Sequence, residues 1–116
     1  MPNMSDQPAK HLVNIARGNI YVPQETFNTY LKGVEAVALL PHEDGILLFP
    51  LIQESAGGLL LKIRNLRGDR IVHAQEFFRN HDYFEEFQER PCEVRWLSDR
   101  AGLLIVGVLR PTQHKM

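Results

Sequence analysis

An internal repeat is the feature that most limits how this chain can fold. The stretch Ile20 to Phe27 (IYVPQETF) reappears as Ile71 to Phe78 (IVHAQEFF), with four of eight positions identical. Each copy lies within the same order of segments, namely a hairpin, a short helix and a second hairpin. A unit of roughly 50 residues with one apolar sheet face buries little surface alone, whereas two facing units can bury both faces. We therefore expect two repeats packed against each other in one domain.

Local signals in the first repeat, about residues 11–51, fit this order. Gly18 lies between two short apolar runs, and the pair Asp44-Gly45 lies between two longer ones, which is typical of hairpin turns. Pro23 suits the start of a helix and Gly33 its end. Between them, helical spacing is found for Phe27, Tyr30 and Leu31. The pattern predicts a hairpin, a helix that includes Lys32 in its last turn, and a hairpin.

The second repeat, about residues 59–109, shows the same signals with one longer segment. Gly68 marks the first turn, and the second hairpin is expected to turn at residues 98–102. The stretch QEFFRNHDYFEEFQER, residues 75–90, predicts a helix longer than its counterpart, with a possible break near His81 and Asp82. In this helix we expect Phe84 and Phe87 to face inward, on the side opposite a solvated acidic face.

Length and composition set the domain organisation. The chain has 116 residues, of which 44% are hydrophobic and 23% charged, values typical of one soluble globular domain. We expect a disordered lead-in at 1–9, a single domain at 10–110 and a loose tail at 111–116. The predicted fold class is mainly β with short helices (α+β).

Cellular context also follows from composition. No apolar run is long enough for a membrane helix, and no secretory signal is recognised at the N-terminus. Cys92 is the single cysteine, which excludes an intrachain disulfide and fits a reducing compartment. We expect a cytoplasmic protein without membrane association, with homo-oligomers possible.

Two alternatives stand for the arginine-rich turn RNLRGDR. Arg64, Arg67 and Arg70 can form a fork that contacts phosphates, because a guanidinium binds such groups through two parallel hydrogen bonds. Equally, the three side chains can belong to an exposed hairpin and pair partly with Asp69. The net charge is −3 over residues 1–58 and +2 over residues 59–116. Basic character is therefore concentrated in the second repeat.

No constellation for catalysis or metal binding is recognised. The five histidines and Cys92 lack the close spacing of zinc ligands. No nucleophile elbow, phosphate-binding loop or dinucleotide-binding glycine pattern occurs. We expect Cys92 to be a small buried residue and Trp96 to lie in the core, or to contact a protein if exposed. The prediction is therefore a non-enzymatic protein with no metal and no cofactor.

Both repeats resemble a known structural unit. NIARGNIYVPQETFNTYLKG and KIRNLRGDRIVHAQEFFRNH are similar to the swapped-hairpin unit of the AbrB, MazE and MraZ superfamily, and the resemblance covers roughly residues 11–109. Two units in one chain are most similar to the arrangement of MraZ. The resemblance implies a pseudo-two-fold, swapped-hairpin barrel of two hairpin-helix-hairpin repeats. The second copy departs from the pattern, because Ala74 stands where the first has Pro23.

The resemblance also implies a function. Members of this superfamily act as DNA-binding transcriptional regulators or antitoxin-like modules, so DNA is the first expected partner. The candidate contacts are Arg17, Arg64, Arg67, Arg70 and Arg79. The alternative is a protein-binding accessory or assembly factor that uses the same fold without DNA. The sequence pI of about 6.5 favours this alternative, because strong nucleic-acid binders are usually basic.

Overall fold

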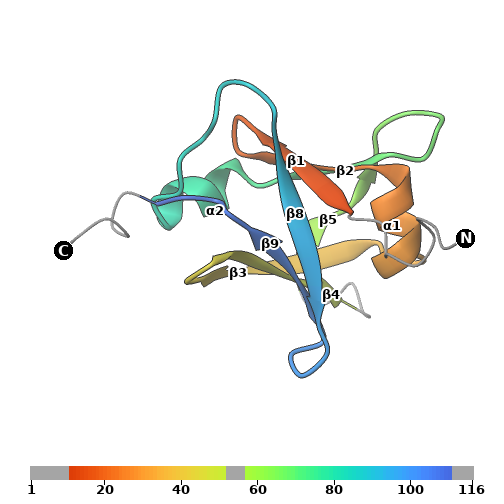
Figure 1. Cartoon of the computed structure of the whole chain (residues 1–116). Coiled ribbons are helices and arrows are strands. Elements are labelled where there is room, and N and C mark those ends of the chain that lie inside the picture. The colour runs from red at the N-terminus through yellow and green to blue at the C-terminus, as the bar shows by residue number, and fades with distance from the viewer. Residues whose placement is uncertain (1–10, 52–56, 111–116) are drawn as a thin grey trace, which may run out of the picture.

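The chain forms a nearly closed antiparallel β-barrel with two short helices, seen in a computed structural model (Figure 1). The structure describes residues 11–51 and 57–110. The expected lead-in and tail therefore lie outside the described residues. Mainly β architecture with short helices, as the sequence predicts, is confirmed.

The elements follow one another in a simple order. They are β1 (Leu12–Ala16), β2 (Asn19–Val22), α1 (Gln24–Tyr30), β3 (Ala36–His42), β4 (Gly45–Leu51), β5 (Leu59–Leu60), β6 (Lys62–Ile63), β7 (Arg70–His73), α2 (Gln75–Asn80), β8 (Arg90–Leu97) and β9 (Gly102–Val106). The strands form one sheet in the order β5-β3-β4-β9-β8-β1-β2-β7-β6. All pairings are antiparallel. The four predicted hairpins are confirmed as β1–β2, β3–β4, β6–β7 and β8–β9.

One residue joins the two ends of the sheet. β5 is the first strand in the sheet order and β6 the last, and only Leu61 separates them along the chain. The backbone N–H of Leu61 donates to the carbonyl oxygen of Glu35 at 2.9 Å, and its side chain is buried. Since β5 pairs with β3 while β6 pairs with β7, the strand interrupted at Leu61 brings the two ends of the sheet together and nearly closes the barrel.

The core fills the inside of this ring. Alternate residues of the strands point inward, as the period of two requires. Fully buried aliphatic side chains include Val13, Ile15, Ile20, Val22, Val37, Ile46, Leu48, Val72, Leu103 and Ile105. The helices also contribute to the core. Phe27 of α1, Leu31 just after α1 and Phe78 of α2 are buried there. Of the stripe predicted for the first helix, Phe27 is buried within α1 and Tyr30 is partly buried, whereas Leu31 is buried but lies beyond the end of the helix.

Helix α1 is shorter than the sequence predicts. It ends at Tyr30, and Leu31 has φ −128° and ψ 16°, outside the helical region. Lys32 consequently lies beyond the helix and not in its last turn. Gly33 has φ +82° and turns the chain toward β3. The difference arises because Leu31 leaves the helix to reach the core, where it is fully buried.

The predicted break near His81 and Asp82 is confirmed, but the helix expected to extend over residues 75–90 does not resume after it. α2 ends at Asn80, and Asp82 takes a left-handed conformation with φ +62°. This turn returns Tyr83 to the core, where its hydroxyl donates to the carbonyl oxygen of Gly45 at 2.6 Å. Tyr83 thus takes the inward place that we expected for other aromatic residues. Phe84 and Phe87 are exposed instead, Phe87 to 86%.

Gly45 marks a close approach between two paired strands. A Cβ atom at this position would lie 1.9 Å from the carbonyl oxygen of Ile105, and the residue has φ +153°. Gly33 also has a positive φ, but a Cβ atom there would meet nothing within 4 Å. An alanine at either position is strained by the positive φ, but only an alanine at Gly45 also clashes with a neighbouring strand. The difference between the two variants therefore reports the cost of the clash.

We predict that Gly45→Ala lowers the free energy of unfolding by at least about 2 kcal/mol more than Gly33→Ala, because only the first forces β4 and β9 apart. Urea denaturation of both variants measures the difference. Equal losses of unfolding free energy in Gly45→Ala and Gly33→Ala would contradict the prediction, because β4 and β9 would then accommodate the added methyl group without cost.

Candidate nucleic-acid or protein interface

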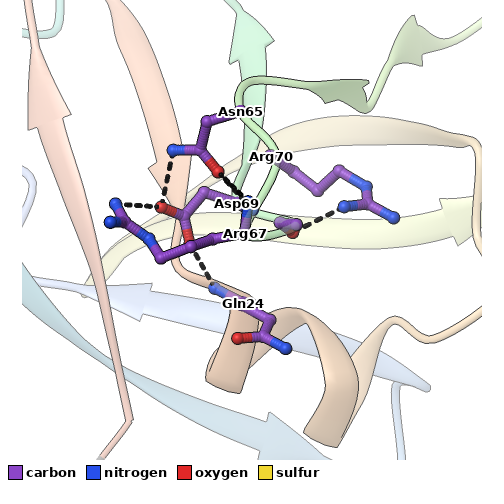
Figure 2. Close-up of polar contacts among 6 residues, drawn as sticks. Gln24, Asn65, Arg67, Asp69 and Arg70 are labelled. Carbon is purple, nitrogen blue, oxygen red and sulfur yellow. Dashed lines mark hydrogen bonds and ion pairs between the residues drawn. The ribbon is translucent and has the colours of Figure 1, made fainter.

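The turn between β6 and β7, residues 64–69, is held in place by the carboxylate of Asp69 (Figure 2). Oδ2 of Asp69 accepts hydrogen bonds from Nδ2 of Asn65 at 2.9 Å and from Nη2 of Arg67 at 3.0 Å. Oδ1 accepts from the backbone N–H of Gln24 at 2.8 Å. We call residues 64–69 the second turn. The hydrogen bond from Gln24 fixes the second turn to the first residue of α1, which lies in the first half of the chain.

Asn65 stabilises the same turn from inside. Its side-chain oxygen accepts from the backbone N–H groups of Arg67 at 3.1 Å and Asp69 at 3.2 Å. Such side-chain contacts to nearby backbone are the usual way in which Asn orders a turn. The second turn thus has a defined shape.

The Asp69 carboxyl titrates well below its ordinary range. Its pKa is lowered to about 2, chiefly by the hydrogen bond from Asn65 and then by the backbone N–H of Gln24, with a smaller effect from Arg67. Both causes stabilise the charged form, because they donate to the carboxylate oxygens. The carboxylate is consequently ionised at neutral pH and offsets part of the positive charge of the turn.

Two of the three arginines of the stretch RNLRGDR, Arg64 in the second turn and Arg70 at the start of β7, lie against aromatic rings. The guanidinium carbon of Arg64 is 4.4 Å from the ring centre of Tyr21, and that of Arg70 is 3.9 Å from the ring centre of Phe27. Nη1 of Arg70 also donates to the carbonyl oxygen of Gly68 at 2.5 Å. Cation–π contacts of this kind contribute roughly 0.5–2 kcal/mol. Arg64 and Arg70 therefore help to hold the turn on the barrel.

The other two candidate arginines also have partners within the chain. Nη1 of Arg17 donates to the carbonyl oxygen of Phe87 at 3.1 Å, and its Nη2 donates to the hydroxyl of Tyr21 at 3.4 Å. Nε of Arg79 lies 3.5 Å from a carboxylate oxygen of Glu85. Tyr21 thus links Arg17 to the second turn through its contact with Arg64, whereas Arg79 contacts a different loop.

Leu66 is the functional candidate that the sequence analysis missed. Its side chain is fully exposed at 106%, and the neighbouring Arg67 side chain is exposed to 76%. A leucine in the middle of the polar turn RNLRGDR was the available signal, because such turns favour polar residues. Ile63 and Leu60, just before the turn, are also exposed.

A groove runs beside the second turn. It has a volume of about 540 Å³, and its apolar wall includes Phe27, Leu61 and Ile63. Two cationic residues, Lys32 and Arg70, and one acidic residue, Glu35, also line it. The surface therefore combines exposed apolar side chains with cationic ones, which is the composition of a binding face for an acidic, partly apolar partner.

The remaining chemical candidates are buried or dispersed. Cys92 is buried, and burial raises the pKa of its thiol, as expected for a core residue and not for a nucleophile. In residues 11–51 and 57–110, no three His, Cys, Asp or Glu side chains are grouped so that they could hold a metal ion. Within the same ranges, no helix has the length and apolar character required to span a membrane.

Comparison with known proteins finds no matching family model, no matching curated protein and no matching solved structure. The assignment of a function therefore rests on the residues and contacts described above.

We predict that Asp69→Asn destabilises the protein at pH 7 by about 1 kcal/mol, after allowance for solvent screening of a surface carboxylate. Because the folded pKa of about 2 is below the unfolded value near 3.8, this contribution is complete above pH 3.8 and is lost as the pH falls through 2. Urea denaturation of the parent and the variant should therefore converge at low pH. Asp99→Asn, in the exposed turn after β8, is the matched control and should change the curve little.

Proposed function

We propose that the barrel is a pseudo-two-fold, swapped-hairpin structure. The strand interrupted at Leu61, composed of β5 and β6, is the counterpart of β1 in the other repeat. With this assignment, exchanging the elements of the two repeats leaves the cyclic strand order unchanged. β1 pairs with β8 of the second repeat, and β5 pairs with β3 of the first. These reciprocal pairings support the exchange of hairpins between repeats.

Equivalent turn-to-helix contacts support the same proposal. The turn at Gly18 lies against Gln75, the first residue of α2, and the turn at Gly68 lies near Gln24, the first residue of α1. A hydrogen bond joins each pair of segments. The N–H of Ala74 donates to the carbonyl oxygen of Gly18 at 3.0 Å, just as the N–H of Gln24 donates to Asp69. Each turn thus contacts the other repeat's helix.

The function that the geometry supports best is that of a non-enzymatic binding module for an acidic partner protein. The observation that carries this proposal is the full exposure of Leu66 on a turn that Asp69 and Asn65 hold in one conformation. A fixed turn loses little conformational entropy on binding, so an apolar side chain at its tip can serve as an anchor.

The charges around Leu66 define the partner. Residues 62–70 include four cationic side chains and one anionic side chain, which gives a formal charge of +3. The cations are Lys62, Arg64, Arg67 and Arg70. A partner segment with carboxylates around an apolar pocket would be attracted by these charges and would bury Leu66.

We predict that a photo-crosslinking residue at position 66 captures a partner in cells, while the same group at the exposed position Ser98 does not. Binding of the purified partner should weaken at least about tenfold in Leu66→Ser, because a buried apolar anchor is lost. Isothermal titration calorimetry measures the affinity, and an unchanged melting temperature shows that the variant folds. Unchanged affinity in Leu66→Ser would refute the proposed anchor.

DNA binding is the second candidate, supported by the exposure of Arg67 and by the resemblance to the AbrB superfamily. If DNA is the partner, we predict that fluorescence anisotropy of a labelled duplex of random sequence detects binding, and that the affinity falls as the salt concentration rises. Arg67→Ala should reduce the slope of log affinity against log salt by about 0.9, the value for one phosphate contact. Leu66→Ser is the control that should leave this slope unchanged. Absence of binding even at low salt would exclude DNA as the partner of this turn.

A further inference from the structure

The two most exposed large apolar side chains of the described residues lie in oppositely charged surroundings. They are Leu66, exposed to 106%, and Phe87, exposed to 86%. Trp96, which we expected in the core or at a protein contact, is 39% exposed, and its ring already stacks on that of Tyr30. Leu66 and Phe87 are therefore the side chains with the largest exposed fraction left for a partner to cover.

Phe87 belongs to an acidic segment. We call residues 84–89, between the end of α2 and the start of β8, the acidic loop. This loop contains three glutamates and no cationic residue, so its formal charge is −3. Residues 62–70, around Leu66, have a formal charge of +3. The chain thus carries two exposed apolar side chains, one in a cationic segment and one in an acidic segment.

Two of the three glutamates of the acidic loop have partners within the chain. Glu85 lies 3.5 Å from Nε of Arg79, and Glu86 lies 3.2 Å from Nε of Arg90. These arginines partly offset their charge. Glu89 is exposed, and it is therefore the carboxylate of the loop that is best placed to meet a cation of a partner.

The acidic loop is held in place by hydrogen bonds to its backbone. The backbone N–H of Arg17 donates to the carbonyl oxygen of Glu86 at 2.5 Å, and Nη1 of Arg17 donates to that of Phe87 at 3.1 Å. The N–H of Phe84 donates to the carbonyl oxygen of Leu109 at 3.0 Å. The loop therefore loses little conformational entropy when a partner covers Phe87, as is also the case for the second turn and Leu66.

The acidic loop and the second turn border the same part of the surface. Nη2 of Arg17 donates to the hydroxyl of Tyr21, and the guanidinium of Arg64 in the second turn lies over the Tyr21 ring. Arg17 and Tyr21 thus connect the loop to the turn, and Figure 1 shows the cyan loop and the green turn on either side of β1 and β2. Leu66 and Phe87 do not bury each other within one chain, since both remain exposed.

A surface with these two parts is complementary to itself. In a two-fold dimer the same surface of each chain is in contact, so that a residue which meets a second residue across the interface is met by it in return. A surface of one charge sign would repel itself in this arrangement, whereas neighbouring cationic and acidic parts attract their counterparts in the other copy. The second turn of each chain can then meet the acidic loop of the other.

We propose that the acidic partner of the second turn is a second copy of this chain. In this two-fold dimer, Leu66 of each copy packs on Phe87 of the other, and Arg67 pairs with Glu89. Arg67 uses Nη2 for Asp69, and a guanidinium has five N–H donors, so others remain for a carboxylate. The inference rests on the proposed function, because it keeps Leu66 as the anchor and identifies what covers it.

The size of the contact sets the strength of the dimer. Two turns and two loops form a small interface, below about 1,200 Å², the range in which weak and transient complexes are found. The dimer is consequently in exchange with the monomer, and it forms only at high protein concentration.

Sedimentation velocity of the purified full-length protein, from about 1 μM to about 1 mM, tests the proposal. We expect a reversible shift from the chain mass of 13.3 kDa to twice this mass, with no larger species. The shift should move to higher concentration as salt is added, because exposed charges are screened. Protein that stays monomeric at about 1 mM overturns the proposal. A mass that keeps rising beyond the dimer overturns the two-fold arrangement, because it indicates a head-to-tail chain.

Two variants identify the contact. Leu66→Ser and Phe87→Ser should each raise the dissociation constant of the dimer at least about tenfold, since every dimer then loses two apolar anchors. Both side chains are exposed, so both variants should melt at the temperature of the parent. Leu40→Ser, which removes an exposed leucine from β3, is the matched control and should dimerise as the parent does. An unchanged dissociation constant in either Leu66→Ser or Phe87→Ser overturns the proposal.

Mixing the two variants tests the reciprocal geometry. A heterodimer of Leu66→Ser with Phe87→Ser keeps one intact contact, between the unchanged turn of one chain and the unchanged loop of the other. Each variant alone keeps none, so the mixture should dimerise more tightly than either variant by itself. A mixture that dimerises as weakly as the separate variants overturns the reciprocal contact.

The same measurements separate this inference from the proposed function. A chain that stays monomeric, but binds another protein in a manner weakened by Leu66→Ser, excludes the second copy and retains the anchor. A dimer that Leu66→Ser leaves unchanged contradicts the anchor itself.

Discussion

The first hairpin has no partner strand within its own half of the chain. β1 pairs with β8 on one side, β2 pairs with β7 on the other, and both neighbours belong to the second half. The hydrogen-bonding groups along β1 and β2 and the apolar faces of Ile15 and Ile20 are satisfied only when both halves are folded. The helix positions, the closing strand at Leu61 and the placement of the second turn all follow from this reciprocal pairing.

The same dependence explains why the second turn can present an unprotected apolar side chain. Asp69 fastens the turn to Gln24 across the boundary between the halves, and Arg70 stacks on Phe27 from the same helix. The turn is thus held by its contacts with α1 and by the hydrogen bonds of Asn65 and Arg67 to Asp69. The side chain of Leu66 is fully exposed and can contact a partner.

Sequence patterns were informative where a backbone requirement was local. Asp44-Gly45 and Gly18 identified their hairpins, and at Gly18 the reason is local, because its φ of +74° is one that few other residues adopt. Pro23 likewise identified the start of the first helix. The end of α2 could not be read in this way. It depends on the positive φ of Asp82 and on the burial of Tyr83, whose hydroxyl donates to Gly45 in the distant strand β4. The arginines were found as a group, but their contacts with Tyr21 and Phe27 depend on tertiary packing that spacing does not encode.

In the two-repeat arrangement that we propose, the turns of the two first hairpins differ in length although they occupy equivalent places in the strand order. Residues 17 and 18 suffice between β1 and β2, whereas residues 64–69 connect β6 to β7. In an assembly of two identical chains, any lengthening of one turn would be imposed on both. With both units in one polypeptide, the short turn can remain packed against α2 while its counterpart acquires a protruding tip. Covalent linkage of the halves therefore permits specialisation of one turn without cost to the other.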